Sequence, residues 1–370
     1  MLTALHNACI FTGEEELSGK SVLIEGNQIK AITSRENLPA DAQNIDLSDQ
    51  YIAPGLIDLQ IYGSGKKLFG GQPSADALAQ MESDLLKQGC TGFLATVATN
   101  SAQIVEQAIE SAKAYRKNSK GNFLGLHLEG PYLNSKRRGA HPEKFIKKAS
   151  LAELKSWIEQ AAGEIKMMTL APELQDEEVL DYLQSQNILI SAGHTDATYE
   201  EADTFFQKQV QAATHLFNAM PQIHHRTPGL IPAIFKQKPF TSIIADGIHV
   251  SFPIIEMAKR QLGDKLFLIT DAVTETSEGI YPHIFNTDRY TMPDGTLSGS
   301  CLTMMQSVKN CVDYAGITLP EALRMASLYP AQLINRQNEF GYIKPGHQAN
   351  LIVFNKELQV TATCLSGLMA

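Results

Sequence analysis

The sequence predicts a (β/α)8 TIM-like barrel that carries a small β-sandwich domain formed by both chain termini. Two observations favour the barrel. Eight short apolar segments alternate with helix-like amphipathic segments between residues 54 and 340, and polar side chains stand at the ends of most apolar segments. A third observation concerns the sandwich, because strand-like segments from both chain ends flank this alternating region. The 370 residues exceed the roughly 250 residues that such a barrel needs, which leaves enough chain for a second, smaller unit.

The N-terminal region, residues 1–53, consists of short segments with the composition of β-strands: Ala8–Phe11, Ser21–Glu25 and Gln28–Ile32. Gly26 and Asn27 separate the last two segments and indicate a hairpin turn. Three short strands bury too little apolar surface alone, so they need a partner sheet. The other end of the chain offers one in Ala349–Phe354 and Leu358–Thr363. We therefore predict one domain from residues 1–53 plus 341–370, with residues 54–340 inserted as the barrel.

The eight barrel strands are predicted at Gly55–Gln60, Gly92–Val97, Phe123–Glu129, Ile165–Leu170, Ile188–Gly193, Ala212–His215, Ser242–Asp246 and Leu266–Asp271. Amphipathic segments between them include Ala75–Gln88, Ser101–Arg116, Ser150–Gly163, Asp176–Gln186 and Thr198–Gln209. A doubly wound open sheet is the alternative. It would carry a glycine-rich phosphate loop after its first strand, and Gly63-Ser-Gly65 matches that pattern only weakly.

The chain after the eighth strand begins with a long connection, residues 272–299. This length is unusual for an α/β connection and predicts a segment that closes over the site. Two terminal helices are expected next, at Thr303–Tyr314 and at Leu319–Leu328, the second one ending before Pro330.

Composition excludes several classes of protein. The net charge of -9 and the lack of a basic stripe interleaved with aromatic residues argue against nucleic-acid binding. The five cysteines follow no metal-binding or disulfide spacing, which is typical of reduced thiols in the cytoplasm. We expect a cytoplasmic protein without membrane contact, since no apolar run reaches the ~18 residues of a membrane span and the N-terminus lacks a signal-peptide pattern.

Four polar residues at strand ends form the candidate site: Glu129, His194, His215 and Asp271. The carboxyl ends of barrel strands meet at one face, so we expect these side chains to lie together. One glutamate and two histidines are a ligand set for a divalent metal, and the aspartate suits a base for metal-assisted hydrolysis. Each residue also has a structural interpretation: a capped surface carboxylate, two core histidines and a helix N-cap. His127 shares the face of Glu129, but we leave it out of the metal site as a structural histidine.

Short motifs along nearly the whole chain carry a specific resemblance: His127-Leu-Glu-Gly-Pro131, Gly139-Ala-His141, Ala192-Gly-His-Thr195, Thr214-His-Leu-Phe-Asn-Ala-Met220, His225-Arg226, Ala245-Asp-Gly-Ile-His249, Ile269-Thr-Asp271 and Gly295-Thr-Leu-Ser-Gly-Ser300. With them the chain resembles the N-acetylglucosamine-6-phosphate deacetylases, a branch of the amidohydrolase superfamily. The segment Ala53-Pro-Gly-Leu-Ile-Asp-Leu-Gln60 is similar to the superfamily at large.

The resemblance implies a reaction and a role for each matched position. The N-acetyl group of N-acetylglucosamine 6-phosphate would be hydrolysed to glucosamine 6-phosphate and acetate, in amino-sugar catabolism or recycling. Metal ligands would be Glu129, His194 and His215, with Asp271 as the acid/base and His141 on the sugar and the acetyl carbonyl.

The phosphate end of the substrate is implied to bind elsewhere in the site. The backbone of Asn218 and Ala219 and the side chain of Arg226 would hold the 6-phosphate, a group that a guanidinium fits well. His249 would reach the phosphate of the neighbouring subunit in a homodimer, so that its contact is made in trans.

One departure from the superfamily bears on the metal. The first strand often ends in His-x-His, which holds a second metal, whereas this chain has Gln60 and Tyr62. We therefore predict one divalent metal per chain, Zn²⁺ in the first place, with Fe²⁺, Mn²⁺ and Co²⁺ as alternatives. Gln60 becomes a hydrogen-bond donor near the metal. In the connection after the eighth strand, residues 273–290 match no motif of the family.

Three other functions are weighed against the deacetylase. The first is the same reaction on N-acetylgalactosamine 6-phosphate, which differs only at the 4-hydroxyl. A cyclic-amide hydrolase of the same superfamily, such as a dihydroorotase, is disfavoured because His-x-His is missing and Arg226 is present. A non-catalytic metal-binding scaffold is disfavoured by Asp271, since such a scaffold needs the ligands but not the base.

Overall fold

The computed structural model describes residues 2–276 and 279–369. Its centre is an eight-stranded parallel sheet in the order β17-β16-β15-β14-β13-β12-β11-β8, which confirms the predicted barrel. These strands are β8 (Leu56–Ile61), β11 (Cys90–Ala98), β12 (Phe123–Glu129), β13 (Ile165–Leu170), β14 (Leu189–Ala192), β15 (Ala212–Ala213), β16 (Phe240–Ile244) and β17 (Leu266–Ile269). Strand β15 is shorter than predicted because His215 has left the strand conformation, with a φ of 37°.

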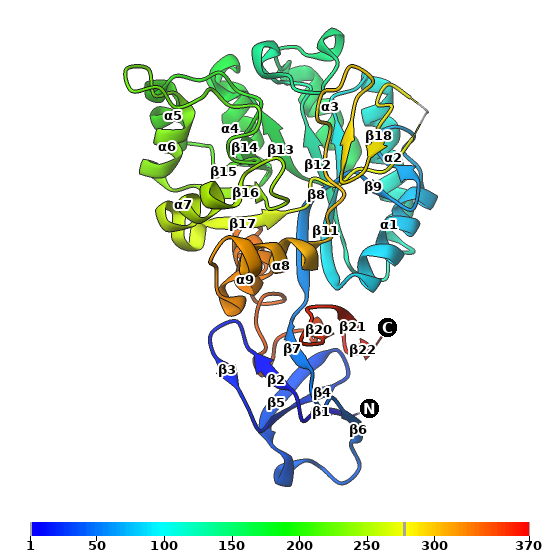
Figure 1. The fold of residues 1–370 in the computed structure, drawn as a ribbon. Coiled ribbons are helices and arrows are strands. Elements are labelled where there is room, and N and C mark those ends of the chain that lie inside the picture. The colour runs from blue at the N-terminus through cyan, green and yellow to red at the C-terminus, as the bar shows by residue number, and fades with distance from the viewer. Residues whose placement is uncertain (1, 277–278, 370) are drawn as a thin grey trace.

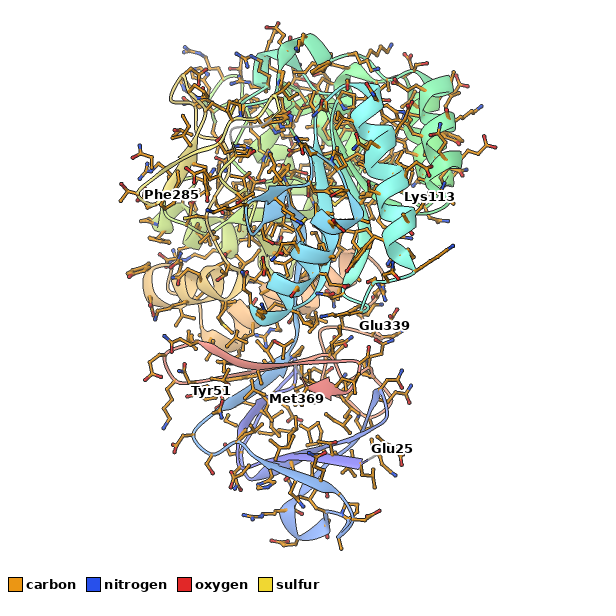
Figure 2. The ribbon with its side chains drawn as sticks, turned by 90° about the vertical axis from the view of Figure 1, so that its right-hand side faces the viewer. Glu25, Tyr51, Lys113, Phe285, Glu339 and Met369 are labelled. Carbon is orange, nitrogen blue, oxygen red and sulfur yellow. The ribbon has the colours of Figure 1, made fainter. Side chains whose placement is uncertain are left out.

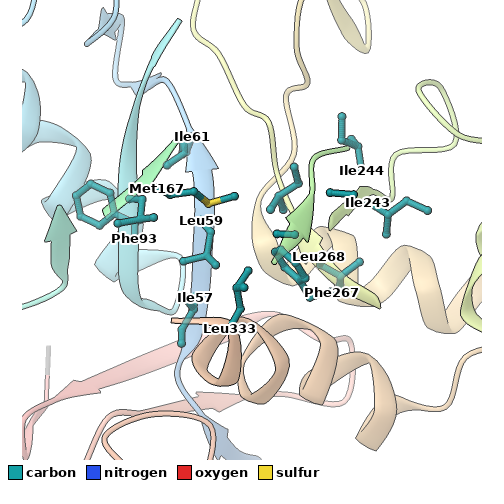
Figure 3. Packing of buried hydrophobic residues seen from close by; sticks show 14 of the residues in the cluster. Ile57, Leu59, Ile61, Phe93, Met167, Ile243, Ile244, Phe267, Leu268 and Leu333 are labelled. Carbon is teal, nitrogen blue, oxygen red and sulfur yellow. The ribbon is translucent and has the colours of Figure 1, made fainter. Parts of the chain in front are cut away.

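The two end strands of this sheet meet and close the barrel. The backbone N–H of Asp271 donates to the carbonyl oxygen of Gln60 at 2.9 Å, and the buried carboxylate of Asp58 in β8 accepts the backbone N–H and the hydroxyl of Thr270. Apolar side chains of the strands fill the space between the strands and the helices (Figure 3). Ile57 and Leu59 in β8 and Phe267 in β17 belong to this core and are at most 1% exposed.

Helices surround the barrel strands (Figure 1). They are α1 (Ala75–Lys87), α2 (Ala102–Arg116), α3 (Leu151–Ala161), α4 (Glu177–Ser185), α5 (Tyr199–Phe206), α6 (Leu230–Gln237), α7 (Phe252–Leu262), α8 (Met304–Tyr314), α9 (Leu319–Ala326) and α10 (Leu328–Leu333). One prediction was wrong at the C-terminal end, because Pro330 does not stop the helical chain but lies inside α10. It occupies the first turn of that helix, where a missing N–H costs no intrahelical hydrogen bond.

Both chain ends form the small β domain, which lies below the barrel in the view of Figure 1. A four-stranded sheet, in the order β5-β4-β1-β6, comes from the N-terminus, whereas a six-stranded sheet, in the order β22-β21-β20-β7-β2-β3, combines both ends. The strands are β1 (Leu2–His6), β2 (Cys9–Phe11), β3 (Glu16–Leu17), β4 (Lys20–Glu25), β5 (Gln28–Ser34), β6 (Gln43–Asp46), β7 (Tyr51–Pro54), β20 (Leu351–Phe354), β21 (Val360–Leu365) and β22 (Leu368–Met369).

The two sheets share one apolar core, to which Val22 and Ile24 of β4 and Leu351 and Val353 of β20 contribute. Figure 2 shows Glu25, Tyr51 and Met369 together in this part of the molecule. The sandwich from both termini is thus confirmed, while the domain boundaries at residues 53/54 and 340/341 stay a prediction.

The long connection after β17 contains a hairpin that the sequence did not indicate, β18 (Ile284–Asn286) with β19 (Arg289–Thr291). Ser277 and Glu278 of this connection lie outside the described residues. The hairpin sits on the barrel part of the molecule, far from the small β domain, as the position of Phe285 in Figure 2 shows. Across residues 2–276 and 279–369, no helix combines the length and the apolar character that crossing a membrane requires.

Candidate active site

The four residues predicted at strand ends lie together at the carboxyl end of the barrel. Glu129 is the last residue of β12, and His194, His215 and Asp271 follow β14, β15 and β17 within two residues. The latter three have φ values of 50°, 37° and 54°. A left-handed backbone is uncommon for residues other than glycine and concentrates at functional sites. In this conformation each side chain turns from the barrel wall into one cavity, which all four residues line.

A layer of hydroxyl groups lies in the barrel under these residues. The hydroxyl of Thr169 is 2.7 Å from Nε2 of His127 and 2.7 Å from the hydroxyl of Thr214, which is 2.6 Å from that of Ser191. His127 is thus a buried, fully bonded structural histidine, as predicted, because its Nδ1 lies 3.0 Å from a backbone carbonyl oxygen. Gly193 leaves room for this layer, since a Cβ atom there would lie 2.6 Å from Cγ2 of Thr169.

Three donor atoms surround one point at the bottom of the cavity. Oε1 of Glu129 lies 3.2 Å from Nε2 of His215 and 3.5 Å from Nε2 of His194, and the two Nε2 atoms are 3.1 Å apart. Donors that bind Zn²⁺ tetrahedrally at about 2.0–2.1 Å are separated by about 3.3–3.4 Å. The observed separations scatter around that value. These residues therefore fit a divalent ion of this size.

The hydrogen bonds of the histidines show which nitrogen can bind a metal. Nδ1 of His194 lies 2.8 Å from the carbonyl oxygen of Arg137, so it carries the proton and leaves the lone pair on Nε2. In His141 the tautomer is reversed, because Nδ1 accepts the backbone N–H of Thr99 at 3.3 Å. Its Nε2 therefore carries a proton and donates to Oε2 of Glu129 at 3.1 Å. Although Glu129, His141 and His194 lie close enough for a metal triad, the hydrogen bonds favour His141 as a donor.

The electrostatics of the site favour a bound cation. Burial alone would raise the pKa of Glu129, but the three histidines beside it hold that pKa well below its usual range. Burial lowers the pKa of His194 to about 4, which leaves a neutral imidazole. Burial also lowers the pKa of His215, but the hydrogen bond and charge of Glu129 outweigh it and raise the pKa overall. The cluster thus attracts positive charge to the point between its donors.

Asp271 lies beside these three donor residues as a separate carboxylate. Burial, and then the negative charge of Glu129, raise the pKa of Asp271 above its usual value. A raised pKa makes the ionised carboxylate a better proton acceptor. Its Oδ1 accepts a hydrogen bond from Nε2 of Gln60 at 2.8 Å, and the same nitrogen lies 2.8 Å from Oε1 of Glu129. Gln60 is therefore the hydrogen-bond donor that the sequence predicted.

The cavity above the donors has a volume of about 170 Å³. Eight of the nine predicted site residues line it: Glu129, His141, His194, His215, Asn218, Ala219, His249 and Asp271.

The prediction for His249 included a contact with the neighbouring subunit. Its Nδ1 pairs with Asp246 at 2.5 Å, and its side chain is 6% exposed. His249 therefore lines the cavity of its own chain, and the contact in trans stays a prediction. Arg226 is separate from the others: it is exposed in the segment 221–227 and is not among the cavity-lining residues of the described chain. Its predicted contact with phosphate is likewise untested.

The long connection after β17 contributes residues that the sequence did not identify. Tyr281 and His283 both line the cavity, and the hydroxyl of Tyr281 donates to the carbonyl oxygen of Thr99 at 2.6 Å. Nδ1 of His283 lies 3.0 Å from the hydroxyl of Ser298. The only sequence signal for this wall was the length of the connection, which correctly predicted a segment over the site.

Comparison with known proteins gives matches over the whole chain. The model of the amidohydrolase family matches residues 51–369, and that of the NagA composite domain matches residues 2–52. An N-acetylglucosamine-6-phosphate deacetylase of Haemophilus influenzae is 34% identical over 379 residues, which cover 99% of both chains.

Solved structures give the same result. A crystal structure of N-acetylglucosamine-6-phosphate deacetylase from Pasteurella multocida superposes with a TM-score of 0.95 at 34% identity, covering 100% of both chains. An aspartate-to-alanine mutant of the Mycobacterium smegmatis enzyme, in complex with N-acetyl-D-glucosamine-6-phosphate, gives a TM-score of 0.90 at 26% identity, covering 100% of this chain and 99% of the other.

Proposed function

The chain belongs to the amidohydrolase family, among its N-acetylglucosamine-6-phosphate deacetylases, and on this basis we propose that it hydrolyses the N-acetyl group of N-acetylglucosamine 6-phosphate. The products are glucosamine 6-phosphate and acetate, which places the enzyme in amino-sugar metabolism. The observation that carries the proposal is the arrangement of Glu129, His194 and His215 around one point, with Asp271 beside them in the same cavity.

Glu129, His194 and His215 would hold one divalent ion per chain. Zn²⁺ is the first choice, because one carboxylate oxygen and two imidazole nitrogens at these separations suit its bond lengths. Fe²⁺, Mn²⁺ and Co²⁺ are the alternatives for the same donor set. A single ion is supported by Gln60 and Tyr62, which take the positions of a second pair of histidines and bind to Glu129 instead. When bound, the ion supplies a lowered pKa for water and polarises the amide carbonyl.

Two side chains carry the proton transfers and the charge that develops on the carbonyl oxygen. Asp271 accepts a proton from the attacking water as the new carbon–oxygen bond forms, and its raised pKa suits that role. The Nε2–H of His141, free of backbone partners, donates to the carbonyl oxygen as negative charge develops there. Asp271 then returns its proton to the amine nitrogen as the carbon–nitrogen bond breaks, so that acetate and a free amine leave.

The remaining predicted residues would bind the sugar and its phosphate. Asn218 and Ala219 line the cavity and would offer backbone groups to the phosphate end, with His249 nearby. Arg226 would add a guanidinium from its exposed segment. The homodimer expected from the sequence is part of the proposal, together with the contact of His249 to the phosphate bound in the neighbouring subunit. A cytoplasmic location stays a prediction.

The experiment that tests the proposal measures acetate release from N-acetylglucosamine 6-phosphate, N-acetylgalactosamine 6-phosphate and unphosphorylated N-acetylglucosamine. The highest kcat/KM is expected on N-acetylglucosamine 6-phosphate. A higher kcat/KM on the galacto epimer would move the function to that substrate. Absence of acetate release from all three sugars would contradict the proposal.

A further inference from the structure

The two oxygens of Glu129 have different surroundings. Oε1 faces the Nε2 atoms of His194 and His215, where a metal would bind. Oε2 points away from that pair and receives two hydrogen bonds, one from the hydroxyl of Tyr62 and one from Nε2 of His141. A carboxylate oxygen has about two lone-pair sites. Two donors therefore occupy Oε2 completely, whereas Oε1 receives one hydrogen bond, from Nε2 of Gln60 at 2.8 Å, and keeps one lone-pair site for a metal.

The direction of the Tyr62 hydrogen bond follows from its partners. An ionised carboxylate can only accept, so the phenol must donate to Oε2. The phenol oxygen in turn lies 2.9 Å from Nε2 of Gln60, which has only hydrogens to offer. Tyr62 is 7% exposed, and its ring packs against Leu68, Val273 and Tyr281. Its backbone N–H donates to the carbonyl oxygen of Ala272 at 2.9 Å. The residue is therefore held at its backbone as well as at its hydroxyl.

The two donors on Oε2 differ in what happens to them during the reaction. In the proposed function, on which this inference rests, the Nε2–H of His141 turns to the carbonyl oxygen of the substrate. Oε2 then keeps one donor, the hydroxyl of Tyr62. Without that hydroxyl, Oε2 would be free to rotate toward the metal and take a second coordination position.

We propose that Tyr62 is a positioning residue, which holds Glu129 in a one-oxygen mode of metal binding and so keeps a coordination position open for water and substrate. From the sequence alone, Tyr62 had no role beyond being a poor second-metal ligand. Its hydroxyl donates to Oε2 of Glu129 and acts through that carboxylate.

The test is Tyr62→Phe, which removes the hydroxyl and keeps the ring in its packing. The protein is loaded with Co²⁺, whose visible absorption weakens when its coordination number rises. We expect a weaker and shifted Co²⁺ spectrum for the variant in the absence of substrate, with about one metal per chain retained. The kcat should fall about tenfold with little change in KM, the range found for outer-shell partners of metal ligands.

A matched control is available in Tyr115→Phe. Tyr115 also donates its hydroxyl to a buried glutamate, Glu82, but in the helix layer away from the site. This control should lower thermal stability and leave the Co²⁺ spectrum and kcat unchanged. An unchanged Co²⁺ spectrum for Tyr62→Phe overturns the assignment, whatever the activity of the variant. A change of the same size in the Co²⁺ spectrum of Tyr115→Phe overturns it as well.

A measurement on the unaltered protein covers the case in which Tyr62→Phe does not fold. X-ray absorption of the Zn²⁺-loaded protein should show a carboxylate bound through one oxygen, and a two-oxygen carboxylate would overturn the assignment. These spectra need no substrate. A protein that releases no acetate would therefore remove the proposed function, while the spectra would still decide the role of Tyr62.

Discussion

Asp271→Asn is the substitution that separates proton transfer from metal binding most cleanly. Asparagine has the same size, and its Oδ1 can still accept the hydrogen bond that Nε2 of Gln60 donates at 2.8 Å. What the variant loses is the ability to take a proton from water and return it to the amine. Asp271 is also outside the set of three donors, so the variant should keep one metal per chain.

The size of the effect follows from the role. A positioned general base contributes about 10²–10⁴-fold to the rate, which is about 3 to 5 kcal/mol of transition-state stabilisation. We therefore expect kcat to fall by that factor, with little change in KM. Burial and the charge of Glu129 raise the pKa of Asp271, so the ionised carboxylate destabilises the folded protein at neutral pH. Loss of this charge should keep or raise the midpoint of thermal unfolding.

The assay combines acetate release, metal content per chain and thermal unfolding on the same preparation. Asp203→Asn is a suitable control, because this aspartate also accepts side-chain hydrogen bonds but lies in α5, away from the cavity. Turnover within a few-fold of the unaltered protein would remove Asp271 from proton transfer. Loss of the metal in Asp271→Asn would show instead that the aspartate is a ligand.

Three further predictions concern other parts of the site. Arg226→Ala should raise KM for N-acetylglucosamine 6-phosphate several-fold in steady-state kinetics, and an equal loss on the unphosphorylated sugar would refute a phosphate contact. Gly193→Ala places a Cβ atom 2.6 Å from Cγ2 of Thr169 and should cost about 1–3 kcal/mol in urea unfolding, so an unchanged midpoint would show that the layer relaxes. Burial lowers the pKa of His283 from 6.5 to about 4. Between pH 6.5 and pH 4, His283 binds a proton when its loop is detached from the barrel, but not when the loop is packed there. The packed position should therefore lose stability as pH falls. Proteolysis of residues 272–299 should be faster at pH 5 than at pH 7, and a rate independent of pH would contradict this reasoning.

The ends of strands were predicted well where residues next to the strand in the sequence mark its end. Strand β12 matches its predicted bounds, Phe123–Glu129, because an apolar run is followed by Gly130 and Pro131, which end it. Strand β15 ends two residues earlier than predicted. The backbone N–H of His215 donates to the hydroxyl of Ser242 in the next strand instead of continuing the ladder. Such a side-chain contact leaves no trace in the periodicity of the sequence.

The clustering of the proposed metal ligands could be predicted because each lies at or just after the end of a strand. The wall of the cavity depends instead on contacts between residues far apart in the sequence. Tyr281 and Thr99 are 182 positions apart, and no motif connects them. The tautomer of His141 depends in turn on the backbone of Thr99, so its role as a donor needed the structure. The sequence showed that Gln60 and Tyr62 replace the two histidines of the superfamily. It did not show that both residues donate hydrogen bonds to Glu129.

The central claim is metal-dependent removal of an acetyl group at a site with one ion. It is tested most directly by acetate release from N-acetylglucosamine 6-phosphate before chelation, after chelation and after Zn²⁺ is added back, with the metal counted per chain. We predict activity that is lost on chelation and restored at about one ion per chain, bound by Glu129, His194 and His215. Full activity in the metal-free protein, or restoration that requires two ions per chain, would contradict the account.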